Sequence, residues 1–439
     1  MKPNIVYDFL RPKKAEDLKQ ALELKFDHID NMEVRVERNA TVLPLRPDSS
    51  VEFGKGGVVD SDNNYIEISG IKETVYGSYD YSSPAVYKDE TVVYLGYLRK
   101  HWGHFLVESA ARLWYVLDDI GGIDKYIFFI DENDDWSLSG NYKEFLSLTG
   151  ILDKVELINE PTTYKCVYIP DRAFKRYDFY SDKYKDIFSK IRKNALDKRL
   201  NLTPHSKIFL SRTHIKNIMK SEIGSDLIDD FFERNGFYII HPQEISLAEL
   251  IFYMCSADEV ASISGSISHN ILFAKDHAKI TVIERNVNNN DFQFYISIMK
   301  ALNSTHVDAT NPIYIVNQGI GPCIFGYNAY LQSFADKNNY LPPSDKYLTD
   351  KYKRKCLKTY MRTYKNFYSY QWYMPEIYYD FIEVLHEAYK DGFNEYREYL
   401  NGTRLFTLHD IFSPIGIHFI RRTLSPFHPK KIIKRILGM

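Results

Sequence analysis

Hydrophobic positions alternate between two spacings along the chain, and this alternation predicts a mixed α/β protein. Residues 34–100 are rich in Val, Ile and Tyr, and their stretches MEVRVERNATVLPL and ETVVYLGYL predict strands. The run KYIFFIDE at 125–132 is continuously apolar until its final acids, which is typical of a parallel strand buried on both faces. Segments with helical spacing lie between such runs, and strands that alternate with helices indicate the α/β class.

From residue 207 the alternation becomes regular. KIFLSRT (207–213) predicts a buried strand that ends in polar residues. The segments that follow predict, in turn, a helix, strand, helix, strand, helix and strand: SEIGSDLIDDFFERNG, FYIIHP, SLAELIFYMCSA, EVASIS, ISHNILFAK and KITVIER. This order predicts a doubly wound domain of the nucleotide-binding type.

The length of 439 residues is too great for one ordinary core and predicts two domains with an appendage. The charged amphipathic segment 183–201, followed by LTPHS, marks the expected boundary. We therefore expect an N-terminal α/β domain over 1–195 and a Rossmann-like domain over 196–330. Residues 331–439 are expected to form a helical, Tyr-rich C-terminal extension with a basic tail.

Composition excludes several classes of protein. A hydrophobic fraction of 44% and a charged fraction of 26% indicate a globular chain, and a net charge of −2 argues against nucleic acid as a partner. The four cysteines show no zinc-binding spacing and are expected to be free thiols, and there is no HExxH motif. The sequence therefore predicts no metal and no cofactor.

Two features bear on localisation. The N-terminus has no long apolar segment of the signal-peptide kind and the chain has no run of 18 apolar residues, so we expect a cytoplasmic protein. The last stretch, IHFIRRTLSPFHPKKIIKRILGM, carries six Lys or Arg and no acid. It predicts either a peripheral anchor at the inner face of the membrane or an ordinary solvated basic helix.

The segment HWGHFLVESAARLW (101–114) combines a helical apolar stripe with charged groups that border it. His104 and Glu108 lie one turn apart, and Arg112 lies a further turn on. One interpretation is a plain amphipathic helix with an exposed Glu108–Arg112 ion pair. The other is a helix that lines a cleft with His104 and Glu108.

Ligands of open α/β sheets bind beyond the carboxyl ends of the strands, and two segments of the second domain lie there. In LSRTHIKN, the residues Ser211, Arg212 and Lys216 follow the first strand. An arginine at this place offers a fork of donors that matches phosphate oxygens, although a structural salt bridge would explain it as well.

The second segment is the small-residue loop SISGSISHN between a strand and a helix. Its small side chains allow backbone N–H groups and the helix dipole to approach an anion, but it lacks both the P-loop and the GxGxxG patterns. Glu284, at the end of the last strand, could hold a ribose hydroxyl or be an exposed strand-end acid. The loop residues that we expect to bind substrate are Ser264, Gly265, Ser266, His269 and Asn270.

Taken in order, GHFLVESAARLW, IFLSRTHIKN and GFYIIHPQEISLAELIFYMCSADEVASISGSISHN resemble the catalytic domain of glycosyltransferase family 61 over residues 95–285. The helix motif of the family corresponds to His104, Glu108 and Arg112, and its strand-end Ser-Arg to Ser211 and Arg212. Its loop usually reads Gly-x-His-Gly-Ala-Gly-Leu-x-Asn. This chain departs from that pattern, because Ser264 replaces the loop histidine and a lysine, Lys216, stands at the second basic position.

The resemblance implies two Rossmann-like domains that face a cleft, in the GT-B arrangement, and a sugar transfer that inverts the anomeric centre. His104 would be the base and Glu108 would orient it, and the reverse assignment stays open. Arg212 and the loop would bind the departing diphosphate without a metal. The implied donor is a nucleotide sugar, expected to be a UDP-sugar.

The implied acceptor is a glycan, free or lipid-linked, in the assembly of a bacterial surface polysaccharide such as capsule, lipopolysaccharide or exopolysaccharide. Two alternatives come from other classes. One is a cell-wall transferase like the polysaccharide pyruvyltransferases, and the other is a non-catalytic glycan-binding protein.

Overall fold

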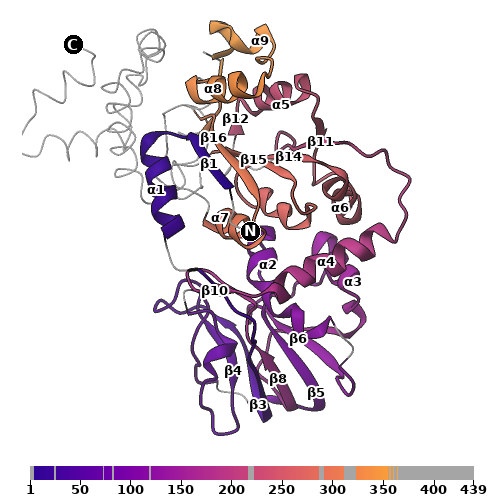
Figure 1. Cartoon of the computed structure of the whole chain (residues 1–439). Coiled ribbons are helices and arrows are strands. Elements are labelled where there is room, and N and C mark those ends of the chain that lie inside the picture. Colours follow the sequence, from indigo (N-terminus) through magenta and orange to yellow (C-terminus); the bar gives the residue numbers. More distant parts are fainter. Residues whose placement is uncertain are drawn as a thin grey trace, which may run out of the picture.

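The protein consists of two six-stranded sheets with helices between them (Figure 1). The computed structural model describes residues 4–363, apart from residues 24–25, 73, 82–83, 118–119, 216–221, 286–290, 311–322, 354, 357–358 and 360–362. Most of the expected C-terminal extension, including the basic tail, lies outside the described residues. The predicted mixed α/β class is confirmed.

The first sheet is mixed. Strand β3 (Val34–Arg46) runs antiparallel to both of its neighbours, whereas the strands from β8 to β7 run parallel. The first domain is therefore not an all-parallel, Rossmann-like domain, because β3 pairs antiparallel with β4, the next strand along the chain. In spatial order the remaining strands are β4 (Lys55–Val59), β8 (Thr162–Pro170), β5 (Val86–Tyr97), β6 (Lys125–Phe129) and β7 (Val155–Ile158).

The second sheet is parallel throughout, as its apolar runs predict. Its order is β1 (Asn4–Phe9), β16 (Asn303–Asp308), β15 (Lys279–Glu284), β14 (Glu259–Ile263), β11 (Lys207–Leu210) and β13 (Tyr238–Ile240). Counted along the chain from β11, the order is that of a doubly wound sheet whose direction of winding reverses between β11 and β14. Such a reversal leaves a crevice at the carboxyl ends of the two strands, where ligands bind.

Helices fill the space between the two sheets. Helices α3 (Gly140–Thr149), α4 (Asp182–Leu196) and α6 (Leu247–Ser256) pack on one another there, and one continuous core joins Phe105, Phe145, Ile251 and Val282 (Figure 1). Helices α5 (Ser225–Arg234) and α8 (Ala329–Asn338) cover the opposite face of the second sheet. The units therefore share their main core.

The first strand of the chain belongs to the second sheet. Strand β1 pairs with β16, Arg11 Nη1 lies 2.6 Å from Asp308 Oδ2, and Phe9 packs edge-on against Phe334 of α8. The expected boundaries at residues 195 and 330 stay a prediction. The strand pairing nevertheless places residues 4–9, and helix α8 with them, on the second sheet.

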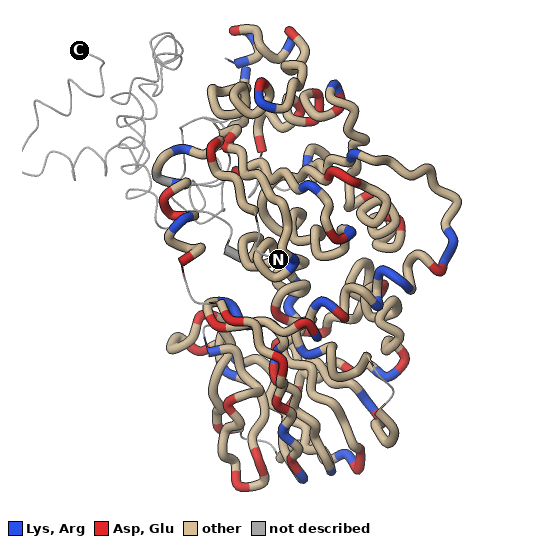
Figure 2. The backbone as a smooth tube through the Cα atoms, viewed as in Figure 1, with Lys and Arg blue, Asp and Glu red and all other residues tan. Residues whose placement is uncertain are grey.

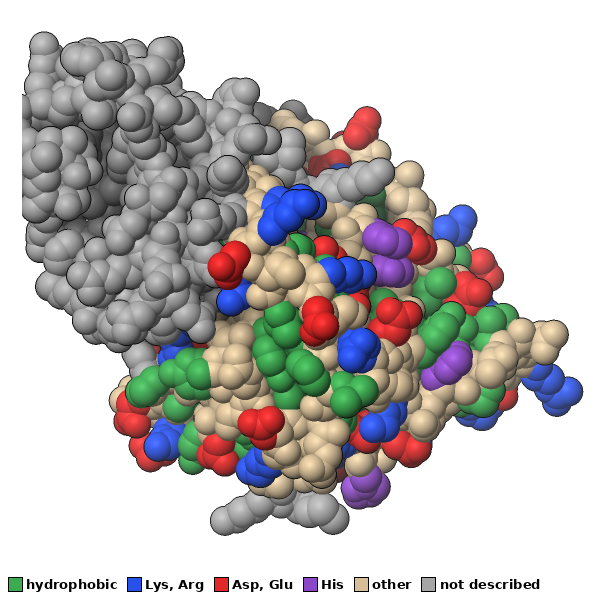
Figure 3. All heavy atoms as spheres, turned by 90° about the horizontal axis from the view of Figure 1, so that it is seen from above, with side chains coloured by type: hydrophobic (Ala, Val, Ile, Leu, Met, Phe, Trp, Pro, Cys, Tyr) green, Lys and Arg blue, Asp and Glu red, His purple; other side chains and the backbone are tan. Residues whose placement is uncertain are grey.

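None of the described helices is long and apolar enough to cross a membrane. Figures 2 and 3 show Lys and Arg interspersed with Asp and Glu, along the chain and on the face seen from above.

The remaining elements of the described chain are short. The short elements are α1 (Pro12–Glu23), β2 (Asp27–His28), η1 (Glu67–Ser69), α2 (Trp102–Val107), η2 (Ser109–Val116), η3 (Leu152–Lys154), β9 (Phe174–Lys175), β10 (Phe179–Tyr180), β12 (Glu222–Ile223), η5 (Ser268–Phe273), α7 (Asp291–Met299), β17 (Cys323–Ile324) and α9 (Asp345–Leu348).

Candidate functional site

The histidine-rich segment forms two short helices that meet at Glu108, and not one continuous helix. The α-helix α2 ends at Val107 and the 3₁₀-helix η2 begins at Ser109. The backbone N–H of Glu108 still donates to the carbonyl of His104 at 2.7 Å, so these two residues remain one α-turn apart. A 3₁₀-helix has three residues per turn, and the change of period turns Arg112 away from Glu108.

His104 and Glu108 form a hydrogen-bonded pair. The distance between His104 Nδ1 and Glu108 Oε2 is 2.9 Å, and Arg99 Nη1 lies 3.6 Å from the same carboxylate oxygen. Burial acts to raise the pKa of Glu108, but the hydrogen bond from His104 and the charges of His104, Arg99 and Arg172 outweigh it and lower that pKa. An ionised carboxylate only accepts hydrogen bonds, so Nδ1 is the donor where His104 pairs with Glu108.

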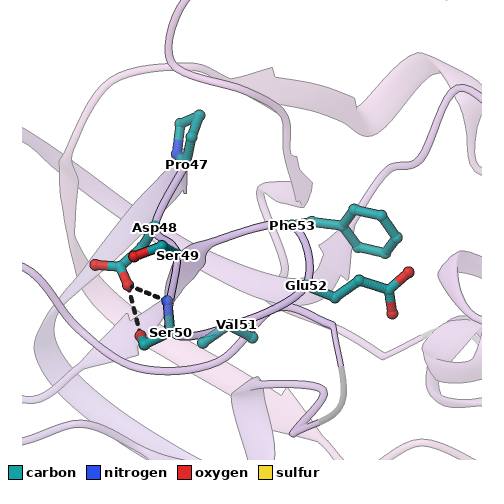
Figure 4. Close-up of a pocket in the computed structure, with 7 residues that line it drawn as sticks. All are labelled: Pro47, Asp48, Ser49, Ser50, Val51, Glu52 and Phe53. Carbon is teal, nitrogen blue, oxygen red and sulfur yellow. Dashed lines mark hydrogen bonds between the residues drawn. The ribbon is translucent and has the colours of Figure 1, made fainter. Parts of the chain in front are cut away.

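Arg99 is a member of this group that the sequence analysis missed. Its guanidinium lies 2.9 Å from His104 Nδ1 and covers the ring of Phe53 at 3.9 Å from the centroid. Phe53 ends the loop 47–53, whose side chains line a pocket at the surface (Figure 4). Asp48 closes this loop by accepting a hydrogen bond from the backbone N–H of Ser50 at 2.9 Å. Two side chains, Phe53 and Arg99, therefore stand between this pocket and the His104–Glu108 pair.

Arg112, which we predicted as a substrate ligand, lies among backbone carbonyls in the interior of the first unit. Its side chain is buried and donates to the carbonyls of Ile68, Ser69 and Pro170 at 2.6, 3.0 and 3.0 Å. A Cβ at Gly96, where φ is +93°, would lie 2.7 Å from Nη1 of Arg112. The ion pair between Glu108 and Arg112, the alternative interpretation, does not form either, because the guanidinium is committed to these carbonyls.

The loop Ser264–Asn270 contacts the beginning of α2. A Cβ at Gly103 would lie 2.9 Å from both Ser266 Oγ and His269 Nδ1, so only a glycine allows this approach. Trp102 Nε1 donates to Asn270 Oδ1 at 2.9 Å. Helix α2 comes from the first unit and the loop from the second, so the structure brings together the predicted residues of both.

Phe292, at the start of α7, lies against both histidines of this contact. Its ring meets the rings of His104 and His269 edge-on, with centroids 5.4 and 5.9 Å away. Arg176 lies 5.0 Å from the centroid of the same ring. The two histidines thus share one aromatic neighbour, which the sequence analysis did not identify.

The helix after the loop is shorter than expected. Residues Ser268–Phe273 form a single 3₁₀-helix of six residues, and Ser264 and Asn270 are buried. A macrodipole grows with the number of aligned peptide units, so this element provides less of one than the predicted helix would. Any anion at this loop must therefore rely on side-chain donors.

Such donors lie directly beside the loop. Arg212 Nε donates to both oxygens of Glu222 at 2.7 and 2.9 Å, and Arg285 Nη1 donates to Glu222 Oε1 at 3.2 Å. Arg285 Nε also donates to the carbonyl of Ser264 at 2.8 Å. The sequence analysis predicted Arg212 and missed Arg285. A usable signal was present, since Arg285 directly follows a strand at the same carboxyl edge of the sheet as Arg212.

Two predicted ligands face the interior instead. The hydroxyl of Ser211 donates to Asp229 Oδ2 on α5 at 2.8 Å and is buried, and burial raises the pKa of Asp229 to about 6. Glu284 Oε1 lies 2.8 Å from Nδ1 of buried His306, so its carboxylate binds inside the sheet–helix interface and not a ribose at the surface. Lys216 lies outside the described residues.

The comparisons with known proteins identify one family. Residues 102–281 match the family model described as Glycosyltransferase 61, and no curated protein matches the chain. The matched range includes His104, Glu108, Arg212 and the loop, whereas Arg99 and Arg285 fall outside it. Within the described part of the chain, no three His, Cys, Asp or Glu side chains are grouped so that they could hold a metal ion.

Proposed function

We propose that this protein transfers a sugar from a nucleotide to a glycan acceptor and inverts the anomeric centre of that sugar. The proposal starts from the family match, which makes residues 102–281 a glycosyltransferase family 61 domain and the protein a glycosyltransferase. The observation that carries the proposal is the contact between two elements. The His104–Glu108 pair on α2 lies against the loop at the reversal point of the second sheet. A base and a phosphate-binding edge therefore belong to one site.

In this mechanism His104 is the base. The acceptor hydroxyl attacks the anomeric carbon from the side opposite the phosphate, and its proton moves to His104 Nε2. Glu108 accepts a hydrogen bond from Nδ1 and stabilises the imidazolium that forms. The opposite assignment, with Glu108 as the base, would require its carboxylate to give up the contacts with His104 and Arg99.

The departing phosphate is bound at the second unit. Arg212, at the end of the strand next to the one that leads into the Ser264–Asn270 loop, offsets the charge that develops on the leaving oxygen, and no metal takes part. The donor is a nucleotide sugar with a diphosphate, and we expect uridine as its base. The acceptor approaches from the first unit, beside Arg99 and the loop 47–53, so the two units act as the two walls of a GT-B cleft.

The biological setting that we propose is bacterial surface polysaccharide assembly on the cytoplasmic side of the membrane, with a glycan or lipid-linked glycan as the acceptor. The basic C-terminal tail would hold the enzyme at the membrane surface. The family match favours sugar transfer over pyruvyl transfer and over non-catalytic glycan binding.

The test begins with nucleotide binding to the full chain. Calorimetry with UDP, GDP, CMP and ADP is expected to show one nucleotide that binds with a Kd of about 1 μM, which is about −8 kcal/mol. Arg212→Ala is expected to abolish this binding. Hydrolysis or transfer of the matching nucleotide sugar is then compared between the wild type and His104→Asn.

His277→Asn is the matched control for the histidine variant. His277 is exposed and has a φ of +69°, a conformation that asparagine tolerates. Equal rates for the two variants would contradict the assignment of His104, and the absence of binding by every nucleotide would contradict the transferase mechanism as proposed.

A further inference from the structure

We propose that Arg285 and Arg212 together form a clamp for the diphosphate of the donor, and that Glu222 holds the two guanidinium groups in register. This inference rests on the proposed function and assigns its leaving group to particular side chains. The clamp lies at the carboxyl ends of β11 and β15, on either side of the strand that leads into the Ser264–Asn270 loop.

Glu222 fixes both arginines at once. It belongs to β12, which pairs with β17, and its carboxylate accepts two hydrogen bonds from Arg212 and one from Arg285. All three side chains are at least nine-tenths buried. Within this group of three, two guanidinium groups face one carboxylate. The other carboxylate that acts on Arg285, Glu284, is hydrogen bonded to His306. Two arginines that share one carboxylate favour an anionic ligand.

The hydrogen bonds also leave a defined set of donors. Arginine has five N–H groups, and Arg212 uses only Nε while Arg285 uses Nε and Nη1. No described residue accepts a hydrogen bond from Nη1 or Nη2 of Arg212 or from Nη2 of Arg285. Both guanidinium groups therefore keep hydrogen-bonding capacity that a phosphate could use.

Gly265 keeps one of these donors open. Its φ is +117°, and a Cβ at this position would lie 2.9 Å from Nη2 and 3.3 Å from Nε of Arg285. Any other side chain would therefore press on the free edge of the guanidinium. The next residue, Ser266, contacts Gly103 of α2, so the clamp and His104 lie on the two flanks of the same short loop.

This position suits the charge that moves during transfer. As the acceptor oxygen bonds to the anomeric carbon, the bond from that carbon to the phosphate oxygen breaks and its electron pair stays on the diphosphate. The acceptor proton goes to His104. Two fixed guanidinium groups stabilise the additional negative charge without a metal ion, and planar forks pair with several phosphate oxygens at once.

The test compares diphosphates with monophosphates. The full chain is titrated with UDP, GDP, CDP and ADP, and then with the monophosphate of the nucleoside that binds most tightly. We expect Arg285→Gln to weaken diphosphate binding at least thirtyfold, by analogy with the loss of one strong charged contact, and monophosphate binding less than about threefold. Gly265→Ala is expected to reduce the same preference in the same direction.

Arg234→Gln is the matched control, because Arg234 is an exposed arginine of the same unit. Arg285→Lys keeps the charge without the fork and serves if the glutamine variant does not fold. It should recover only part of the preference. A ratio of diphosphate to monophosphate affinity that stays within about threefold of the wild type in Arg285→Gln or Arg285→Lys would overturn the clamp.

Other outcomes separate the clamp from the proposed function. Wild-type sugar transfer together with an unchanged ratio in the Arg285 variants would remove the clamp and leave the function in place. Preferential binding of a monophosphate such as CMP by the wild type would also overturn the clamp. A wild type that binds no nucleotide would overturn both proposals.

Discussion

Two groups of the molecule, around Glu108 and around Glu222, combine a carboxylate with arginine but differ in their other member and in their exposure. In the first unit, Glu108 faces one arginine and one histidine, and the His104 side chain is 25% exposed. In the second unit, Glu222 faces two arginines, and no side chain of the three is more than 7% exposed. The first group contains the histidine that we propose as the base, and the second contains the two arginines that we propose as the diphosphate clamp.

A comparison of Arg112 with Arg285 shows that burial alone does not identify a ligand. Both side chains are buried beside a glycine with positive φ. Arg112 donates to three backbone carbonyls, whereas Arg285 shares the carboxylate of Glu222 with a second arginine. The partners of the two side chains, and not their burial, are the reason that we propose only Arg285 as a ligand of an anion.

The largest effect is expected at the histidine. His104→Asn should lower the rate of transfer about 10²–10⁴-fold, the usual contribution of a general base, because the acceptor proton has no receiver. Nucleotide affinity should change less than about twofold, because the second unit binds the nucleotide. Steady-state kinetics and calorimetry on the same preparation check both values. A loss of nucleotide affinity as large as the loss of rate would show that the group around Glu108 also takes part in nucleotide binding.

Removal of the shared carboxylate should act mainly on stability. Glu222→Gln leaves two buried guanidinium groups without a counter-charge, and the free energy of unfolding should fall by about 3–5 kcal/mol. Inorganic phosphate or a nucleoside diphosphate should restore more stability to this variant than to the wild type. Urea unfolding of both proteins, with and without phosphate or nucleoside diphosphate at about 10 mM, measures the difference. An equal gain in the free energy of unfolding for the variant and the wild type would argue against an anion site.

Arg112→Met should destabilise the protein and leave its chemistry intact. The methionine fills much of the volume but removes the guanidinium donor of the Ile68 and Pro170 carbonyls, which costs about 1–3 kcal/mol for each unsatisfied group. The Ser69 carbonyl keeps the hydrogen bond from the Tyr94 hydroxyl. We expect a loss of about 3 kcal/mol in urea unfolding. The kcat/KM per folded molecule should stay within about twofold, and a much larger loss would return Arg112 to the site.

The smallest effect concerns Asp229. Its folded pKa is raised to about 6 from 3.8, so the folded state binds the proton more strongly and loses relative stability as the pH rises through this interval. Asp229→Asn should therefore stabilise the protein at pH 8 by about 1–3 kcal/mol and by much less at pH 4. Thermal unfolding at the two pH values, with exposed Asp186→Asn as the control, measures it. A gain that is equal at both values would contradict this explanation.

The sequence predicted what local patterns determine. Apolar runs identified the parallel strands. The spacing also predicted correctly that His104 and Glu108 lie one helical turn apart. Arg212 was predicted as a ligand because strand ends in open sheets bind ligands, and the structure places it just after β11; its role stays a prediction. These signals each lie within a few residues, where spacing is enough to predict which side chains share a face.

The misses come from contacts between distant segments. Nothing near Arg112 predicts that three carbonyls from two other segments surround it. Arg285 had the same local signal as Arg212, the end of a parallel strand, but its contact with Glu222 joins distant segments. The pairing of β1 with β16 joins opposite ends of the described chain, beyond the reach of any local pattern.

That strand pairing has a consequence for biosynthesis. The ribosome makes β1 early in the chain, but its neighbour β16 (Asn303–Asp308) emerges only after nearly all the other strands. Until then β1 is a strand with unpaired backbone groups, the kind of segment that chaperones shield and that associates with other edges. A bulky fusion at the N-terminus should therefore delay completion of the nucleotide-binding half, while the mixed sheet, whose strands are contiguous in synthesis, assembles first.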